Sequence, residues 1–366
     1  MLHGSDHLFL QAAIELAERG LYSTTPNPRV GCLIVRGGRV VGRGAHMRAG
    51  EGHAEVNALR DAGASARGAT AYVSLEPCAF HGRTPPCTEA LIDAGIKRVV
   101  AAMTDPHERV AGAGFEWLRG AGIDVDVVEV PEAWALNAGY VMRVRHGRPF
   151  VRIKVAASAD GRTAMASGES QWITGPEARA DVQYWRARSC AILTGSGTVL
   201  TDDPQLTVRD ARYAVDGRLR QPIRVVADSG LRIPADAALL QSDGPILLAH
   251  GSGVSPRLAG VEHIACGDRS VDLHGLLRAL GGRGCNEVLV EAGPTLVGAL
   301  LAAGLWDELL LYTAPKLLGS DARPLAQLPL VSMGEAVAAT IADVTRVGAD
   351  VRVRLTPERA SQPQEL

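Results

Sequence analysis

A histidine, a glutamate and two cysteines in the first quarter of the chain have the types and spacing of a metal site. Glu55 follows His53 by two positions, and Cys78 and Cys87 each come directly after a proline. Zinc takes imidazole nitrogen and thiolate sulfur as tetrahedral ligands, and three protein ligands leave the fourth position for water. The metal acidifies that water, and a neighbouring carboxylate can take its proton and pass it to a leaving group. We therefore predict Zn²⁺ bound by His53, Cys78 and Cys87, with Glu55 as the proton carrier.

The order His-x-Glu, then Pro-Cys, then a second Cys is typical of zinc deaminases that act on nucleobases. Here the two cysteines are nine positions apart, and the insert between them contains His81, Arg83 and Thr84, which suit contact with a phosphate. A structural zinc site remains an alternative, because His81 would supply the fourth protein ligand that such a site requires. A chance grouping of Cys and His is the other alternative.

Composition limits the classes of protein that the chain can represent. With 366 residues it exceeds one usual hydrophobic core, so we expect two domains, 1–147 and 148–366, joined near a basic stretch with Gly and Pro. A net charge of −2 argues against nucleic acid as a partner, and no apolar run approaches a membrane span. The N-terminus lacks the features of a secretion signal. Six cysteines in a chain of this length favour a reducing, cytoplasmic location over a disulfide framework.

Hydrophobic periodicity predicts alternating strands and helices, which indicates an α/β class in both halves. In the first half we expect helices at 5–19, 53–61, 87–95, 114–119 and 131–144, and strands at 30–35, 40–45, 71–75, 98–103 and 124–130. In the second half we expect strands at 150–157, 191–194, 223–227, 246–249, 287–291, 308–313 and 351–355, and helices at 176–188 (capped by Thr174), 271–280 and 294–303. The helices that begin at His53 and Cys87 would present these side chains from their N-termini, where thiol pKa values fall.

Two turns in the second half follow predicted strands and suit a bound phosphate group. Gly195-Ser196-Gly197-Thr198 lacks the third glycine of the dinucleotide motif, which is replaced by Leu200. Glu291 to Leu296 is a strand end that passes into a helix N-terminus, whose free N–H groups favour a diphosphate. Ordinary turn chemistry is the alternative for each turn, and two such turns in one domain favour a nucleotide.

Motifs in both halves are similar to the RibD family, the bifunctional enzymes of riboflavin biosynthesis. In the first half they are Asn27-Pro28-x-Val30-Gly31, Gly52-His53-Ala54-Glu55 and the Cys78 to Cys87 segment with Gly82-Arg83-Thr84-Pro85-Pro86. In the second half they include Gly168-Glu169-Ser170-x-Trp172-Ile173-Thr174, Gly195-Ser196-Gly197-Thr198, Asp202-Asp203-Pro204-x-Leu206-Thr207-x-Arg209 and Glu291-x-Gly293-Pro294. The resemblance implies an N-terminal cytidine-deaminase-like α/β/α domain and a C-terminal dihydrofolate-reductase-like α/β domain.

The resemblance also implies the reactions and the residues that serve them. The first is zinc-dependent deamination of 2,5-diamino-6-ribosylamino-4(3H)-pyrimidinone 5′-phosphate, and the second is reduction of 5-amino-6-(5-phosphoribosylamino)uracil by NADPH. The partners implied are small phosphorylated pyrimidines and further copies of the chain. Asn27 and His46 would line the pyrimidine pocket, and His81 and Arg83 would meet the phosphate. NADPH would take Ala156, Trp172, Thr198, Asp202, Ser229, Gly293, Pro294, Thr295, Leu296, Val297, Gly298 and Ala299, and the second substrate Lys154, Ser170, Leu206, Arg209 and Glu291.

Two other functions are compatible with the motifs. A deaminase of free nucleosides or tRNA would carry a basic groove with stacking aromatic side chains, and aromatic residues make up only 4% of the chain. A non-catalytic protein with a structural zinc ion would show a fourth protein ligand at the metal.

Overall fold

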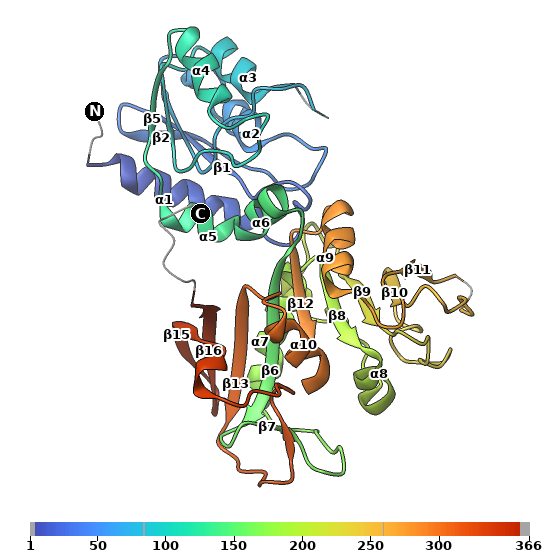
Figure 1. The fold of residues 1–366 in the computed structure, drawn as a ribbon. Helices are drawn as coiled ribbons and strands as arrows, with labels where there is room; N and C mark the ends of the chain where they lie inside the picture. Colours follow the sequence, from blue (N-terminus) through green and yellow to red (C-terminus); the bar gives the residue numbers. More distant parts are fainter. Residues whose placement is uncertain (1–3, 83–84, 259, 359–366) are drawn as a thin grey trace. The chain divides into compact units, whose positions relative to one another are not determined.

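The computed structural model describes residues 4–82, 85–258 and 260–358. It divides into two units, Met1–Gly147 and Arg148–Leu366, each built on its own sheet (Figure 1). The α/β class predicted for both halves is confirmed. Within the described ranges, no helix is long and apolar enough to cross a membrane.

The N-terminal unit contains a five-stranded sheet in the order β2-β1-β3-β4-β5. The strands are β1 (Gly31–Arg36), β2 (Arg39–Ala45), β3 (Thr70–Val73), β4 (Arg98–Ala101) and β5 (Asp124–Val127). β1 runs antiparallel to β2 and β3, whereas β3, β4 and β5 are parallel. Gly37 and Gly38 both have positive φ, 58° and 75°, which is the backbone of the tight two-residue hairpin that their sequence predicts.

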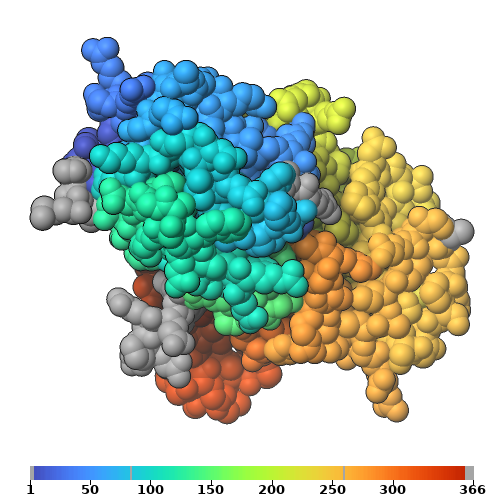
Figure 2. All heavy atoms as spheres, turned by 90° about the horizontal axis from the view of Figure 1, so that it is seen from above, coloured from blue at the N-terminus to red at the C-terminus, as the bar shows by residue number. Residues whose placement is uncertain are grey.

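Helices cover both faces of this sheet. The helices are α1 (Asp6–Ala17), α5 (Pro131–Leu136) and α6 (Ala138–His146) on one side, and α2 (Ala54–Ala62), α3 (Cys87–Asp93) and α4 (Ala113–Gly120) on the other. Glycines allow the close approach, since a Cβ at Gly31 would lie 2.1 Å from Ala13 O of α1, and one at Gly44 2.1 Å from Ala54 O of α2. Figure 2 shows α3 and α4, in cyan and teal, on the outer surface of this unit. The predicted α/β/α layering is therefore present.

One predicted helix of this unit is wrong in its extent. The single helix expected over 131–144 is two helices, α5 and α6, with a break at Asn137. The Asn137 side chain accepts a hydrogen bond from Arg29 N (2.8 Å) and donates one to Arg29 O (3.0 Å). These two bonds tie the break to the segment just before β1.

The C-terminal unit contains a nine-stranded sheet in the order β11-β10-β9-β8-β12-β6-β13-β16-β15. The strands are β6 (Phe150–Ser158), β8 (Ala191–Gly195), β9 (Ile223–Ala227), β10 (Ile246–His250), β11 (Glu262–Ala265), β12 (Glu287–Glu291), β13 (Glu308–Ala314), β15 (Ala339–Val347) and β16 (Asp350–Pro357). From β11 to β13 all neighbours are parallel, and β16 and β15 complete the sheet as antiparallel strands. β11, β15 and the small pair β7 (Arg162–Ala164) and β14 (Arg323–Pro324) were not expected.

The faces of this second sheet are covered by different helices. α9 (Leu273–Gly282) and α10 (Pro294–Ala302) pack on the face that carries Val288 and Val290, and α7 (Pro176–Arg188) packs on the face of Leu289 and Ile192. α7 begins after Gly175 rather than at a Thr174 cap, and the Asp350 carboxylate accepts the Gly175 N–H at 2.7 Å. The expected glycine turn after β8 is instead the direct start of α8 (Ser196–Asp202).

Candidate active sites

His53, Cys78 and Cys87 come together at the N-termini of two helices. His53 is the N-cap residue of α2, Cys87 is the first residue of α3, and Cys78 lies in the loop after β3. His53 Nδ1 lies 3.2 Å from Cys87 Sγ and 3.6 Å from Cys78 Sγ, and the three ligand atoms all lie within 4.8 Å of one another. Tetrahedral zinc with Zn–N of about 2.0 Å and Zn–S of about 2.3 Å separates its ligand atoms by about 3.5–3.8 Å. The donor set and its spacing therefore fit a zinc ion.

The electrostatics of this cluster favour the metal-binding form of one ligand, the Cys78 thiolate. The pKa values of His53 and Cys87 are instead raised, chiefly by their hydrogen bonds to Cys78. The pKa of Cys78 is lowered to about 4, chiefly because the Cys87 thiol donates a hydrogen bond to the Cys78 sulfur. Hydrogen bonds from the His53 ring and from the Cys87 backbone N–H lower it further. The N–H of Cys87 belongs to the first turn of α3, so the N-terminus of that helix points at the Cys78 sulfur. A thiolate next to an imidazole is a pair of groups that zinc binds readily.

Glu55 lies beside the cluster, buried and within the first turn of α2. His53 has an extended backbone (φ −69°, ψ 166°), so the histidine precedes the regular helix and its side chain can share a site with that of Glu55. Glu55 is only 3% exposed. Burial raises its pKa to about 7, and the charge of Cys78 adds to this shift. A carboxyl group with a pKa near neutrality is suited to both accept and release a proton.

Two of the four residues expected to contact the first substrate adjoin the metal ligands. His46 Nε2 accepts from Asn27 Nδ2 at 3.0 Å, while Nδ1 lies 3.2 Å from Gly52 O, and the His46 and His53 rings meet edge to face at 5.0 Å. Burial lowers the pKa of His46, in accord with a neutral ring that accepts at Nε2 and donates at Nδ1. These contacts place Asn27 and His46 next to the predicted zinc position.

The two residues expected to meet the phosphate are placed differently. His81 is exposed, and its Nε2 lies 3.6 Å from a carboxylate oxygen of Glu89. Arg83 lies outside the described residues. In the part of the chain that the structure describes, the group of metal-ligating side chains holds three members and His81 is not among them. This favours an open coordination position over a structural site with four protein ligands.

Glu76 is a buried residue of this site that the motifs did not identify. Its carboxylate accepts the backbone N–H groups of Asp105 (3.1 Å), Gly112 (3.0 Å) and Gly114 (2.9 Å). Because Glu76 stands two positions before Cys78, these bonds fix the Cys78 loop to the segment that leads into α4. Its position directly before Pro-Cys was the available signal, but its partners are distant in sequence.

In the C-terminal unit, several predicted residues gather where the parallel strands end. Lys154 on β6 and Glu291 on β12 are directly paired neighbours in the sheet. Glu291 is held by a bidentate ion pair with Arg186 of α7, with N–O distances of 2.6 and 3.0 Å. Burial would raise the pKa of Glu291, but the charge and hydrogen bonds of Arg186 outweigh it and hold the pKa below its ordinary value. Sequence reasoning missed Arg186, which belongs to no motif.

Burial also acts on the lysine of this cluster. It lowers the pKa of Lys154, because a charged ammonium loses hydration there, while Glu291 opposes the shift. Lys154 and Ala156 lie on the same face of β6, two positions apart. Both are half-buried, so each has a solvent-facing part. The carboxyl ends of parallel strands are where ligands bind in open α/β sheets.

The residues expected at the nucleotide lie around the same strand ends. Thr198 Oγ1 accepts the N–H of Gly293, which is the N-cap of α10, at 3.1 Å. This contact brings together the two turns that the sequence predicts as phosphate sites. It also places the N-terminus of α10, a nine-residue helix, beside α8. Ser229 follows β9, and its Oγ accepts from Val271 N at 3.1 Å. A helix N-terminus flanked by small residues fits the diphosphate of a nucleotide cofactor.

The remaining predicted residues divide between surface and core. Ser170 Oγ donates to Asp202 at 3.3 Å; Ser170 is half-buried, whereas Asp202, Arg209 and Trp172 are exposed. Three others are buried: Leu206 in the core beneath α7, and Val297 and Gly298 on the core side of α10. Pro294 and Leu296 are half-buried, as is Ala292 before them, whereas Thr295 and Ala299 are exposed. A side chain in the core can affect a ligand only through its backbone or its packing.

Comparisons with known proteins agree with both halves of this description. The family described as "Cytidine and deoxycytidylate deaminase zinc-binding region" matches residues 4–103, and the "RibD C-terminal domain" matches residues 149–353. The riboflavin biosynthesis protein RibD of Escherichia coli K12 is 51% identical and covers 96% of this chain and 99% of its own length. The solved structure of Acinetobacter baumannii RibD, form 1, is 45% identical with a TM-score of 0.91, covering 97% of this chain and 99% of that one.

A second solved structure adds the name of an activity. It is a diaminohydroxyphosphoribosylaminopyrimidine deaminase/5-amino-6-(5-phosphoribosylamino)uracil reductase from Thermotoga maritima. It is 32% identical with a TM-score of 0.86 and covers 96% of this chain and 98% of its own. The expected pairing of a cytidine-deaminase-like unit with a reductase unit is confirmed. The chain belongs to the RibD family, the bifunctional deaminase and reductase enzymes of riboflavin biosynthesis.

Proposed function

We propose that this chain deaminates 2,5-diamino-6-ribosylamino-4(3H)-pyrimidinone 5′-phosphate and then reduces 5-amino-6-(5-phosphoribosylamino)uracil to the ribitylamino product. The observation that carries the first reaction is the cluster of His53, Cys78 and Cys87 with the buried Glu55 beside it. The observation that carries the second is the strand-end site of Lys154 and Glu291 next to the α10 N-terminus. The Thermotoga relative, named for both activities, supports assigning both to one chain.

In the deaminase site, each residue has a distinct task. Zinc, when bound by His53 and the two cysteines, supplies the Lewis acid that makes water nucleophilic at neutral pH. Glu55 takes the proton of the attacking water and delivers it to the departing ammonia, so the proton is returned within one turnover. Asn27 and His46 hold the pyrimidine, and His81 and Arg83 hold the phosphate. The charge on Glu55 changes in each transfer, which its burial and raised pKa make less costly.

In the reductase site, the chain binds NADPH and the second substrate and holds them next to each other. NADPH, when bound, supplies the hydride that reduces C1′ of the opened ribose. The α10 N-terminus from Gly293 onward, with Thr198, receives the diphosphate. Lys154 and Glu291 hold the second substrate, together with Ser170, Leu206 and Arg209. Arg186 keeps Glu291 ionised and in place, because its guanidinium binds both carboxylate oxygens.

The two reactions can be tested separately. Supplied with the diaminopyrimidine ribotide and no NADPH, the zinc-loaded chain should release ammonia. Supplied with the deaminated ribotide and NADPH, it should lower the nicotinamide absorbance without releasing ammonia. Ammonia release from free cytidine, with none from the ribotide, would instead identify a nucleoside deaminase.

The metal ligands make a prediction of their own. Cys87→Ser should lower bound zinc by about tenfold or more, because a hydroxyl replaces a thiolate ligand. Elemental analysis after dialysis measures this. Cys266→Ser, a change of the same type at a buried thiol in the other unit, should keep the metal. Equal zinc content in both variants would contradict the assignment of Cys87.

We also propose that the enzyme is a homo-oligomer. This is supported by apolar side chains on β15 and the segment before it: Val331 is 88% exposed, Met333 89% and Ile341 63%. Singly exposed apolar residues are ordinary, but a group of them beside an edge strand is typical of an interface. Ile341→Arg should therefore shift the mass measured by light scattering toward the monomer, and Thr340→Arg, at an exposed polar neighbour, should shift it less. A wild-type monomer would refute the proposal.

A cytoplasmic location is proposed as well. All six cysteines lie within the described residues and are free thiols. A reducing compartment would keep Cys78 and Cys87 available for zinc, since oxidation of the pair would remove two ligands.

A further inference from the structure

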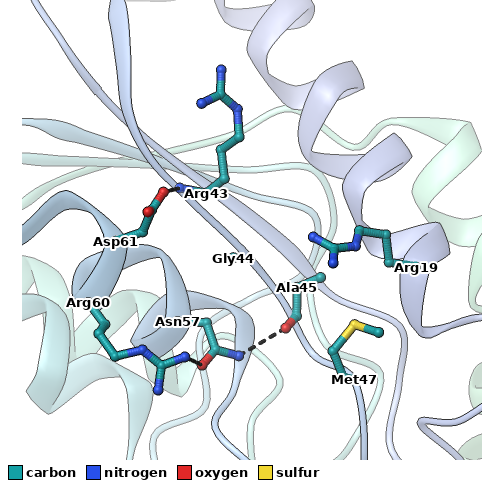
Figure 3. A pocket seen from close by; sticks show the side chains of 8 residues that line it. All are labelled: Arg19, Arg43, Gly44, Ala45, Met47, Asn57, Arg60 and Asp61. Carbon is teal, nitrogen blue, oxygen red and sulfur yellow. Dashed lines mark hydrogen bonds between the residues drawn. The ribbon is translucent and has the colours of Figure 1, made fainter. Parts of the chain in front are cut away.

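A second pocket of the N-terminal unit lies apart from the metal ligands, along the outer edge of β2. It has a volume of about 580 Å³ and is bordered by β2, α2 and the short 3-10 helix Glu18–Gly20 that follows α1. This volume is in the range of small-molecule sites. Its lining includes Arg19, Arg43 and Arg60, which Figure 3 shows on three sides of the backbone at Gly44 and Ala45.

The charges around this pocket are unbalanced. Of the described residues that line the pocket, Asp61 is the only acidic one, and its carboxylate accepts the backbone N–H of Arg43 at 2.8 Å. Arg60 donates to Asn57 Oδ1 at 2.9 Å. Among the described residues, the guanidinium groups of Arg19 and Arg43 have neither a hydrogen-bond nor an ion-pair partner. Three cations thus line one hollow with a single carboxylate, in a chain whose net charge is −2.

The hydrogen-bond chemistry of the pocket is also one-sided. Two outward-facing backbone groups of the edge strand are already paired with α2: Arg43 N–H with Asp61, and Ala45 O with Asn57 Nδ2 at 2.9 Å. Asn57 Nδ2 also donates to Gly52 O at 3.0 Å, so this amide has no free donor. These bonds occupy one backbone donor and one backbone acceptor of the edge strand, and they leave the arginine N–H groups as the main unused donors. Such a site favours a ligand that carries several acceptors and negative charge.

We propose that this pocket binds the phosphoryl or diphosphoryl group of a small molecule, at a site separate from both active sites. Arginine recognises phosphate oxygens through two parallel N–H bonds, and guanidinium groups from two elements can grip one phosphate from different sides. A strand from another protein is disfavoured, because Asn57 and Asp61 block the backbone groups that such a strand would pair with. Within the described ranges, no metal ligand and no residue assigned to a substrate lines the pocket.

The arginines themselves provide a readout that the active sites do not affect. Full-length, zinc-loaded chain is treated with phenylglyoxal, with and without pyrophosphate, at matched ionic strength, and modification of each arginine is followed by peptide mass spectrometry. Arg19 and Arg43 should react about fivefold more slowly, or slower still, once pyrophosphate is several times its dissociation constant. Arg36 and Arg39, exposed on the same hairpin but outside the pocket, should react at unchanged rates.

A pair of matched variants tests whether the pocket acts as one site. In Arg43→Ala, pyrophosphate should no longer protect Arg19, whereas in Arg39→Ala the protection should remain. Inorganic phosphate in place of pyrophosphate distinguishes a single phosphoryl site, which it would protect equally, from one that needs a diphosphoryl group; either result supports the proposal. Unchanged rates at Arg19 and Arg43, or equal protection of Arg36 and Arg39, would overturn it.

Discussion

Glu55→Gln is expected to lower the kcat of deamination by about 10²–10⁴-fold, the usual contribution of a positioned acid–base group. The amide has nearly the shape of the carboxyl group, so the buried position stays filled, but it cannot take the proton of the attacking water. Zinc content and the rate of the reductase step should stay at the wild-type level. Ammonia release, elemental analysis and NADPH consumption measure the three quantities on one preparation.

Glu51→Gln is the matched control for this variant. Glu51 lies four positions away, and its exposed carboxylate pairs with Arg48 at 3.5 Å. Its replacement should leave deamination unchanged. Ammonia release at the wild-type rate from the Glu55 variant would contradict the role assigned to Glu55, whatever the control does.

Arg186→Met is expected to destabilise the C-terminal unit by about 3–5 kcal/mol at neutral pH, because it leaves a buried carboxylate without its partner. The Glu291 side chain is 11% exposed and that of Arg186 12%. The same variant should lose most of its reductase activity, since Glu291 would no longer be held in place. Denaturant unfolding, monitored through hydrogen exchange of the β12 amides, measures the loss of stability. NADPH consumption measures the loss of reductase activity.

The pH dependence of the destabilisation by Arg186→Met distinguishes an unpaired Glu291 carboxylate from a simple loss of packing. In the wild type the folded pKa of Glu291 is depressed, so its stabilisation is present above the unfolded pKa and is lost as the pH falls through the folded pKa. In Arg186→Met, burial would raise that pKa, so the destabilisation should shrink as the pH falls toward 4.5, the ordinary value. Arg186→Met/Glu291→Gln should recover much of the lost stability. Equal destabilisation at all pH values would indicate packing alone.

The deaminase site could be predicted from the sequence because its ligands are short-range features of helix starts. His53 and Cys87 stand where turn residues give way to helical periodicity, and Cys78 where a buried strand ends. A helix N-terminus and a strand end each fix where a side chain points, so residue type and spacing were sufficient. The same reasoning located the α10 N-terminus, where Gly293 and Pro294 mark the start of the helix.

Residues that act through distant partners could not be predicted in this way. Arg186 lies on a helix with no motif, and its partner Glu291 is 105 positions away. Glu76 accepts from backbone groups 29 to 38 positions later, which no local pattern records. β15 was missed because its half-buried positions include the polar Asp343 and Thr345, while the apolar Ile341 and Val344 are exposed. Apolar and polar residues therefore do not alternate along it as they do in a typical strand.

A residue that belongs to a family motif does not always contact a ligand with its side chain. Leu206 has a positive φ of 54°, rare for a residue with a side chain, and that side chain is packed beneath α7. In the proposed site its backbone therefore meets the substrate. Val297 likewise contributes by packing α10 against the sheet. Gly298 contributes by letting α10 approach the loop at Gln327, because a Cβ at Gly298 would lie 2.1 Å from Gln327 O. Burial thus sorts a list of motif residues into those that touch a ligand and those that shape its site.

A single time course tests most directly whether one chain carries out both reactions in order. Zinc-loaded enzyme is mixed with the diaminopyrimidine ribotide and NADPH, and ammonia and NADPH are followed together. Ammonia should appear first, NADPH should fall after a lag, and the two amounts should become equal at completion. In Glu55→Gln both signals should stay flat until deaminated ribotide is added, which should restore NADPH consumption alone. Consumption of NADPH without prior release of ammonia would contradict the proposed sequence of reactions.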